Sequence, residues 1–150
     1  YMTVLAWDGV SLAADRLACA GNMRATVTKI ARCDNELIGI CGALPLGNLL
    51  RNWYLNGADP EMFPESGVDD ETTEMVVIKA DGTVWIYSGS STPFEIEDEM
   101  CAFGAGNEAA LAALYCGATA EQAVEIASMI NNTCGNGIDV VPLVPKEERH

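Results

Sequence analysis

The sequence predicts an α+β fold in which antiparallel strands and helices form a layered sandwich. Three observations predict it. Strand-like apolar runs come in pairs joined by turn residues, helical apolar stripes come in separate blocks, and the order is strands, helix, strands, two helices, strand. This grouping favours antiparallel sheets over the alternating order of a parallel βαβ sheet.

The first third of the chain predicts two hairpins. The first joins Val4–Trp7 to Val10–Ala13 through Asp8-Gly9, a pair typical of a tight two-residue turn. The second is built from the apolar runs on either side of Asp34-Asn35, which are Val27–Arg32 and Leu37–Cys41.

A helix is predicted after Pro45, because an apolar stripe recurs there at helical spacing until Asn56-Gly57. The stripe consists of Leu46, Leu49, Leu50, Trp53 and Tyr54. Residues 58–74 are acidic, contain two prolines and are expected to form a loop.

The remainder predicts a third hairpin, a short strand, two helices and a last strand. These are Met75–Ala80 and Thr83–Ser88 around Asp81-Gly82, Met100–Phe103, Asn107–Cys116, Thr119 to about Thr133, and Ile138–Leu143. Gly117 ends the first of these helices, and Thr119-Ala-Glu-Gln122 is a capping box for the second. We expect one domain over residues 1–144 and a frayed tail over 145–150.

The charge is strongly acidic, with 22 Asp and Glu against 8 Lys and Arg. Nucleic acid is therefore an improbable partner, because binding it requires a basic face. The acidic residues form two groups, which are Asp59, Glu61, Glu65, Asp69, Asp70, Glu71 and Glu74, and then Glu95, Glu97, Asp98 and Glu99. We interpret both as solvated surface rather than as a cation site, since no spacing matches a calcium loop.

The cysteines and the hydropathy predict a cytoplasmic protein. Six cysteines occur without a CxxC pair and mostly within apolar runs, as expected for reduced core residues. They are Cys19, Cys33, Cys41, Cys101, Cys116 and Cys134. No stretch approaches the roughly 20 apolar residues of a membrane span, and no secretory signal is present.

Histidine chemistry is excluded by composition. The only histidine, His150, resembles the first residue of a purification tag, and Tyr1 before Met2 resembles a vector remnant. Without an internal histidine there is no Ser-His-Asp triad, no Cys-His pair and no His-based zinc site. A lysine or a terminal amine is the base that remains, and no metal or cofactor is expected.

Lys29 is the first candidate for such chemistry. Alternation along the expected strand Val27–Cys33 puts it on the apolar face and puts Ile30 on the opposite, polar face. A lysine on an apolar face needs a carboxylate, and Asp15 after the apolar run Val10–Ala14 is the natural partner. The pair is compatible with a simple salt bridge at a strand edge and with a catalytic site.

Two other motifs are less favourable candidates. Gly104-Ala-Gly-Asn-Glu-Ala109 matches the dinucleotide fingerprint, but hairpins precede it and a second helix follows, which is the wrong context. Its glycines are better explained by a sharp turn into the helix. Cys41 has no internal histidine to activate it and is expected to be a core cysteine.

Thr3 opens the strand-like run after Met2. Removal of Met2 would give Thr3 a free α-amine beside its hydroxyl, and that amine can activate its own hydroxyl as a base. While Tyr1 and Met2 remain attached, the amine is an amide and the protein is expected to be inactive.

Together these residues resemble the proteasome-type N-terminal-nucleophile hydrolases. These include proteasome β-subunits, the proteolytic subunit of the bacterial two-component ATP-dependent protease, and smaller proteasome-like peptidases. The match is best over residues 3–42, where the chain supplies Thr3, Asp15, Lys29-Ile30 and Gly42 in the family's order. It is weaker over residues 100–137, through Gly104-Ala-Gly106 and Thr133-Cys-Gly135.

The resemblance implies a four-layer αββα sandwich with a shortened first helical layer, assembled into rings that enclose the sites. It implies that Thr3 attacks the scissile carbonyl while its amine relays the proton. Lys29, held by Asp15, would stabilise the deprotonated hydroxyl, and the Gly42 N–H would stabilise the oxyanion. Ile40, with Cys19 and Val27, would line an apolar substrate pocket.

Two departures from the family pattern concern the surroundings of the threonine amine. A supporting serine falls on Ala105, and an aspartate expected before the last turn, which contains Cys134, falls on Asn131 or Asn132. Loss of such supporting groups can reduce activity strongly.

The leading hypothesis is a ring-forming threonine peptidase acting on peptides or proteins, with an unfoldase partner of unknown identity. A catalytically degenerate scaffold protein and an amidase for a small molecule are the alternatives.

Overall fold

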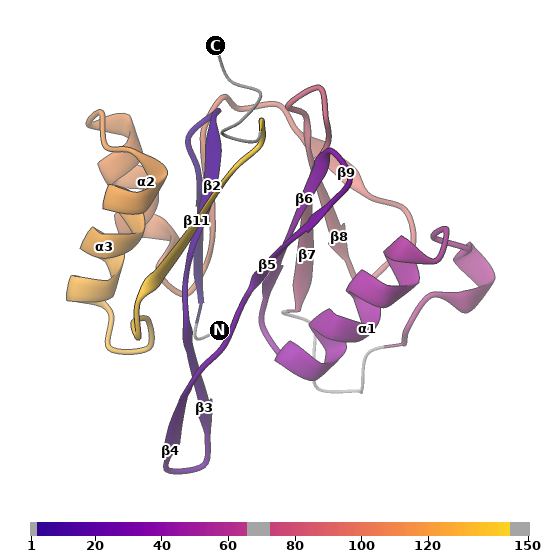
Figure 1. The fold of residues 1–150 in the computed structure, drawn as a ribbon, viewed down its shortest axis with the longest axis horizontal. Helices are drawn as coiled ribbons and strands as arrows, with labels where there is room; N and C mark the ends of the chain where they lie inside the picture. Colours follow the sequence, from indigo (N-terminus) through magenta and orange to yellow (C-terminus); the bar gives the residue numbers. More distant parts are fainter. Residues whose placement is uncertain (1–2, 66–72, 145–150) are drawn as a thin grey trace.

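The structure is a computed structural model that describes residues 3–65 and 73–144. Four layers follow one another in Figure 1. They are the helices α2 (Asn107–Tyr115) and α3 (Ala120–Ile130), a four-stranded sheet, a five-stranded sheet and the helix α1 (Leu44–Leu55). The predicted α+β fold with antiparallel sheets is confirmed, and the layering agrees with the αββα sandwich.

The four-stranded sheet brings distant parts of the chain together. Its order is β10-β1-β2-β11, formed by Cys101–Gly104, Val4–Trp7, Ser11–Asp15 and Ile138–Pro142. In the antiparallel register Val4 lies opposite Gly104, and Asp15 lies opposite Ile138. The start of β1 therefore meets the end of β10, and the end of β2 meets the start of β11.

The five-stranded sheet is a meander in chain order. Its strands are β5 (Ile30–Cys33), β6 (Glu36–Cys41), β7 (Glu74–Ile78), β8 (Val84–Ser88) and β9 (Phe94–Ile96). The two hairpins predicted here are present, and β9 was not predicted. A strand of three residues with a charged residue at its centre carries too little alternation to be recognised.

A second unpredicted feature is the hairpin of β3 (Leu17–Ala20) and β4 (Met23–Thr26). It projects beyond the sandwich at the lower edge of Figure 1. Its first strand is rich in small residues, and neither strand has the bulky alternation that indicates a half-buried strand. Only Arg16 separates it from β2.

The helix boundaries follow from local hydrogen bonds. The predicted capping box is present: Thr119 Oγ1 accepts from the Gln122 backbone N–H at 3.2 Å, and Gln122 Oε1 accepts from the Thr119 N–H at 2.9 Å. The helix α3 ends at Ile130 and not near Thr133, because Asn131 is extended and its Oδ1 accepts from the Thr133 N–H at 2.9 Å. The side chain thus competes with the helix for this donor.

Apolar contacts fill all three spaces between the layers. The two sheets pack through residues that include Leu5, Leu12, Ile30, Leu37 and Ile86. The helices α2 and α3 cover the four-stranded sheet through Val4, Ala13, Leu114 and Val124, and α1 covers the other sheet through Leu50 and Trp53. Burial of this kind supplies the main stabilisation of a domain.

The segment expected to be a loop contains more structure than predicted. Pro60–Met62 form a short 3-10 helix, η1, whose N-cap Asp59 accepts from the Glu61 N–H at 3.0 Å. Glu74 begins β7 and is half-buried, so it is not part of a solvated surface. Asp69, Asp70 and Glu71 lie outside the described residues, as do Tyr1, Met2 and the predicted tail at 145–150.

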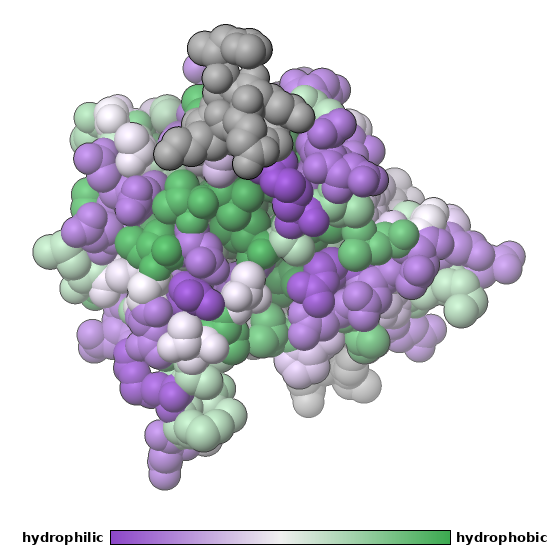
Figure 2. Space-filling view, viewed as in Figure 1, coloured by the Kyte–Doolittle hydropathy of each residue, from purple (hydrophilic) through white to green (hydrophobic). Residues whose placement is uncertain are grey.

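The surface is mostly polar in the view of Figure 2, with apolar side chains gathered around β2 and β11. Exposed residues from these parts include Val10 and Val140. All six cysteines are free thiols, and Cys116 is exposed, contrary to the expectation for the core. Within residues 3–65 and 73–144, no helix combines the length and apolar character needed to cross a membrane.

Candidate active site

A cavity of about 220 Å³ opens where the start of β1, the β3–β4 hairpin and the start of α1 meet. It brings together six of the residues singled out in the sequence, which are Thr3, Cys19, Val27, Lys29, Ile40 and Gly42. Its remaining lining is apolar and was not predicted: Leu17, Ala18, Ala43, Leu44 and Pro45. The cavity therefore combines a hydroxyl and an amine with apolar walls.

Thr3 lies directly before β1 and is only 3% exposed. Its carbonyl accepts from the Gly106 N–H at 3.3 Å. Gly104 has a φ of +89°, and a Cβ there would overlap the carbonyl of Thr3. A Cβ at Gly106 would come within 2.9 Å of the Val4 Cβ. The two glycines thus allow the turn after β10 to lie against Thr3, which explains the G-x-G motif without a nucleotide.

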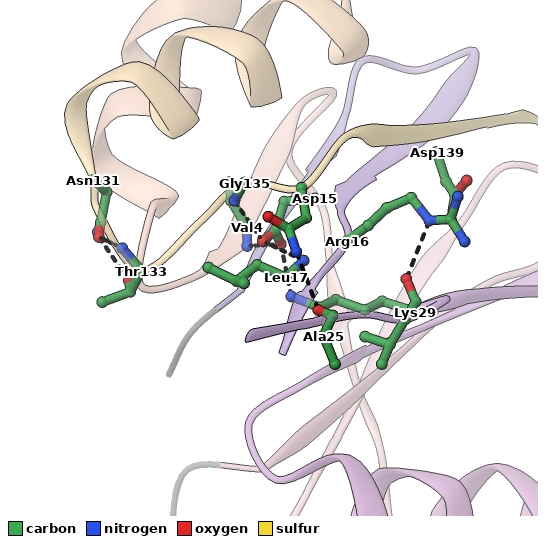
Figure 3. Close-up of polar contacts among 12 residues, drawn as sticks. Val4, Asp15, Arg16, Leu17, Ala25, Lys29, Asn131, Thr133, Gly135 and Asp139 are labelled. Carbon is green, nitrogen blue, oxygen red and sulfur yellow. Dashed lines mark hydrogen bonds and ion pairs between the residues drawn. The ribbon is translucent and has the colours of Figure 1, made fainter. Parts of the chain in front are cut away.

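Asp15 and Lys29 form the predicted ion pair. Lys29 Nζ donates to Asp15 Oδ1 at 2.8 Å, and both side chains are buried. Backbone N–H groups also donate to the carboxylate: Val4 to Oδ1 at 3.0 Å, Gly135 to Oδ2 at 3.0 Å and Leu17 to Oδ2 at 3.3 Å. Figure 3 shows Asp15 between these donors. Such partners are what a buried carboxylate requires.

The route by which Lys29 reaches the site differs from the prediction. The strand β5 begins at Ile30 and not at Val27, and residues 27–29 link the β3–β4 hairpin to the five-stranded sheet. We call residues 27–29 the crossing segment. Ile30 does not lie on a polar face, since it is buried between the two sheets. Lys29 is buried at the end of the crossing segment, where its amine meets Asp15, whereas Thr28 just before it is exposed.

Gly42 follows β6 with a φ of +99°, in the left-handed region that favours glycine. The next residue, Ala43, donates its N–H to Thr73 Oγ1 at 3.0 Å. This bond fixes the chain between β6 and α1 beside the cavity.

The floor of the cavity depends on a small residue in α1. Ile40 lines the cavity, and a Cβ at Gly47 would overlap the Ile40 side chain. Gly47 therefore allows α1 to approach β6 closely enough to close this side of the cavity. The prediction that Ile40 lines an apolar pocket gave no indication of Gly47, because this contact joins two elements that are separate in the sequence.

The cavity lining does not include Ala105, Asn131 or Cys134. They lie behind it, near Gly135, which donates to Asp15. Asn131 Nδ2 donates to the Ala105 carbonyl at 3.2 Å, and the Cys134 N–H donates to the Asn131 carbonyl at 3.2 Å. Asn131 Oδ1 also accepts from Thr133 Oγ1 at 2.6 Å. Burial raises the pKa of the Cys134 thiol above its ordinary value. This region is joined to Asp15 through Gly135.

The burial of Cys41 argues against it as a nucleophile. The thiol is buried, and desolvation raises its pKa to about 12, with a further contribution from the Glu74 carboxylate. A thiol in this state is not the nucleophilic thiolate at neutral pH. Among the described residues, no three His, Cys, Asp or Glu side chains group as metal ligands would.

Comparisons with known proteins agree with this fold. No family model and no curated protein matches the chain. Among solved structures, BPH of Thiobacillus denitrificans in complex with epoxomicin superposes with a TM-score of 0.69 at 20% identity, over 95% of this chain and 100% of that chain. Eukaryotic HslV from Trypanosoma brucei superposes with a TM-score of 0.65 at 22% identity, over 93% and 98%.

The chain has the fold of the proteasome-type N-terminal-nucleophile hydrolases. The resemblance suggested by Thr3, Asp15, Lys29 and Gly42 is thus confirmed for the fold. At these identities the superpositions show the fold alone.

Proposed function

We propose that the protein is a threonine peptidase of proteasome type that cleaves peptide bonds with Thr3 once Thr3 is the first residue. The observation that carries the proposal is one cavity lined by Thr3, Lys29 and Gly42, with Lys29 held by the buried Asp15. A buried ion pair can be purely structural, but here its cation lines the same cavity as a hydroxyl.

The proposed reaction uses only these groups. The Thr3 hydroxyl oxygen attacks the carbonyl carbon of the peptide bond, and its proton passes to the α-amine of Thr3. Lys29 stabilises the oxygen as it loses its proton, and the Gly42 N–H stabilises the oxyanion, a kind of donor that contributes about 3–4 kcal/mol in measured cases. The α-ammonium then protonates the leaving amine, and water hydrolyses the ester on Thr3.

The cavity favours a peptide over a small-molecule amide as substrate. Its volume of about 220 Å³ is smaller than the roughly 300–1,000 Å³ of pockets that enclose whole small ligands. It is suited to one apolar side chain of a longer substrate that continues over the surface. We further propose self-association into rings, as the family resemblance implies.

The test is intact mass spectrometry with epoxomicin on protein in which Met2 directly precedes Thr3 and is removed by aminopeptidase. An epoxyketone forms its stable ring only with a hydroxyl and a free amine on one residue. We expect one adduct per chain at Thr3 and none for Thr3→Ala. A free Thr3 without an adduct would instead favour the degenerate scaffold, the alternative suggested by Ala105. Native mass spectrometry of the same sample measures the ring size.

A further inference from the structure

We infer that Arg16 is a positioning residue for Lys29, an inference that rests on the proposed function. Arg16 is not among the residues that line the cavity. It lies between Asp15 and the β3–β4 hairpin, and its side chain reaches the crossing segment that carries Lys29. Figure 3 shows Arg16 on one side of the ion pair, with Asn131 and Thr133 on the other side.

The crossing segment depends on bonds from outside the strand ladders. The Val27 N–H donates to the Arg16 carbonyl at 2.8 Å, and the Ile40 N–H donates to the Lys29 carbonyl at 3.0 Å. The first bond fixes the segment to the strand end that holds Asp15, and the second fixes it to β6. The position of Lys29 is therefore set by hydrogen bonds at both ends of the crossing segment.

The Arg16 side chain reinforces the first of these attachments. Its Nε donates to the Val27 carbonyl at 3.2 Å, and its Nη2 donates to Thr28 Oγ1 at 3.3 Å. The planar guanidinium donates in fixed directions, so two contacts on successive residues define the position of the segment. The segment that they define ends one residue later at Lys29.

Arg16 is itself held in place. Its backbone N–H donates to the Gly135 carbonyl at 2.9 Å, and Nε lies 3.4 Å from Asp139 Oδ2 on β11. Asp139 Oδ2 is buried and has no hydrogen-bond partner among the described residues. Its negative charge is therefore compensated by the ion pair with Arg16. The four-stranded sheet thus orients Arg16, and Arg16 orients the segment before Lys29.

The expected consequence is a loss of chemistry that exceeds the loss of substrate binding, which Val27 of the same segment also affects. Displacement of a catalytic group by about 1 Å can cost about 100-fold in rate. For Arg16→Gln we expect kcat to fall about 10–100-fold and KM to change by a clearly smaller factor. Arg16→Lys keeps the charge but loses the forked guanidinium, so its kcat should lie between those of the original protein and Arg16→Gln. Asp139→Asn leaves the Val27 and Thr28 contacts and should lower kcat about 2–5-fold.

Arg32→Gln is the matched control. Arg32 lies on β5 and donates to the carbonyls of Pro142 and Leu143, so it also joins the five-stranded sheet to the chain around β11. In the described part of the chain, Arg32 makes no hydrogen bond to the crossing segment. The control removes the same charge and a similar pair of hydrogen bonds to backbone carbonyls. It should keep kcat within about 2-fold of the original protein.

A second readout does not require activity. The chain has three lysines, Lys29, Lys79 and Lys146, so acylation at each can be followed by peptide mass spectrometry. Lys29 is 5% exposed and should react slowly. Arg16→Gln should raise its acylation rate at least about 5-fold relative to Lys79 in the same sample, whereas Arg32→Gln should not.

The two readouts separate the two proposals. If the original protein forms no epoxomicin adduct, the proposed peptidase function fails and the acylation rates alone decide the role of Arg16. An unchanged Lys29 rate in Arg16→Gln would overturn the inference, as would an active Arg16→Gln with kcat within about 2-fold of the original. If Arg16→Gln does not fold, the same two measurements on Asp139→Asn and Arg16→Lys decide it.

Discussion

Two regions beside Thr3 are built differently. On one side Asp15 accepts from Lys29 and from the backbone N–H groups of Val4, Leu17 and Gly135. On the other side the turn around Ala105 is held through main-chain atoms, with the Asn131 side chain donating to the Ala105 carbonyl. We call these the Asp15 cluster and the Ala105 turn. The Asp15 cluster holds a buried charge, so disrupting it costs a large free energy of unfolding. The Ala105 turn can vary without leaving a charge uncompensated.

Asp15→Ala should have the largest effect, because it removes the acceptor on which the whole cluster depends. It leaves a buried lysine without its carboxylate and three backbone donors without their acceptor. Breaking a buried pair in this way costs about 3–5 kcal/mol, a large part of the roughly 5–15 kcal/mol that stabilises a domain. Urea denaturation measures the loss, and a free energy of unfolding within about 1 kcal/mol of the original protein would contradict this account.

Lys29→Met should instead abolish activity and spare the fold. Asp15 keeps its three backbone donors, so its charge remains hydrogen-bonded. We expect kcat to fall on the order of 1,000-fold, with a stability loss of about 1–3 kcal/mol. Peptide hydrolysis and circular dichroism on the same sample check both parts. Preserved turnover would remove Lys29 from the mechanism.

Gly104→Ala tests the Ala105 turn where it touches Thr3. Gly117 is the matched control, because both glycines have positive φ, at +89° and +99°, but a Cβ at Gly117 has no atom within 4 Å. Each substitution should cost about 1–3 kcal/mol through backbone strain. Only Gly104→Ala should also displace Thr3 and lower the rate of epoxomicin adduct formation. Equal adduct rates in the two variants would show that the close approach is not needed.

Ala105→Ser restores the hydroxyl that the family pattern places near the threonine amine. We expect kcat to rise several-fold while stability stays within about 0.5 kcal/mol, as for most surface substitutions. Ala102→Ser on the neighbouring strand is the control for an added hydroxyl. A fall in kcat for Ala105→Ser would mean that the turn is already optimal in its present form.

Glu74→Gln should have the smallest effect and concerns a carboxylate outside the cluster. Burial raises the pKa of Glu74, so its charged form is disfavoured by folding. The unfolded chain then holds fewer protons than the folded one over the range between the two pKa values, and stability falls as pH rises through that range. We expect Glu74→Gln to raise the melting temperature at pH 7 and to leave it unchanged at pH 3. An equal shift at both pH values would point to packing rather than charge.

The parts of the site that the sequence predicted are those with a local signature. Asp15 after an apolar run and Lys29 within one were recognisable because charge is unusual in those places, and their 2.8 Å contact confirms the pairing. Gly104 and Gly106 were recognised as a turn, but their contact with Thr3 depends on the pairing of β1 with β10. The β3–β4 hairpin and the role inferred for Arg16 depend on which distant segments lie side by side, and no periodicity along the chain records that.

The fold as a whole was more predictable than its details. The three hairpins around Asp8-Gly9, Asp34-Asn35 and Asp81-Gly82 were recognised by their turn residues, and all three are present. The start of β5 was misplaced by three residues, because Val27 and Thr28 have strand-like side chains but their backbone leaves one sheet for another. Tertiary contacts override residue propensity at such a crossing.

The bond between the Gly135 N–H and Asp15 joins residues 120 positions apart, which has a consequence for synthesis. A ribosome that adds about 5–20 residues per second needs at least about 6 s between these two residues. During that interval the nascent chain carries Asp15 without one of its donors, and for most of it Thr3 lacks its neighbours at 104–106. If the proposed peptidase function is correct, a polypeptide that stops before Gly135 should be unable to cut its neighbours.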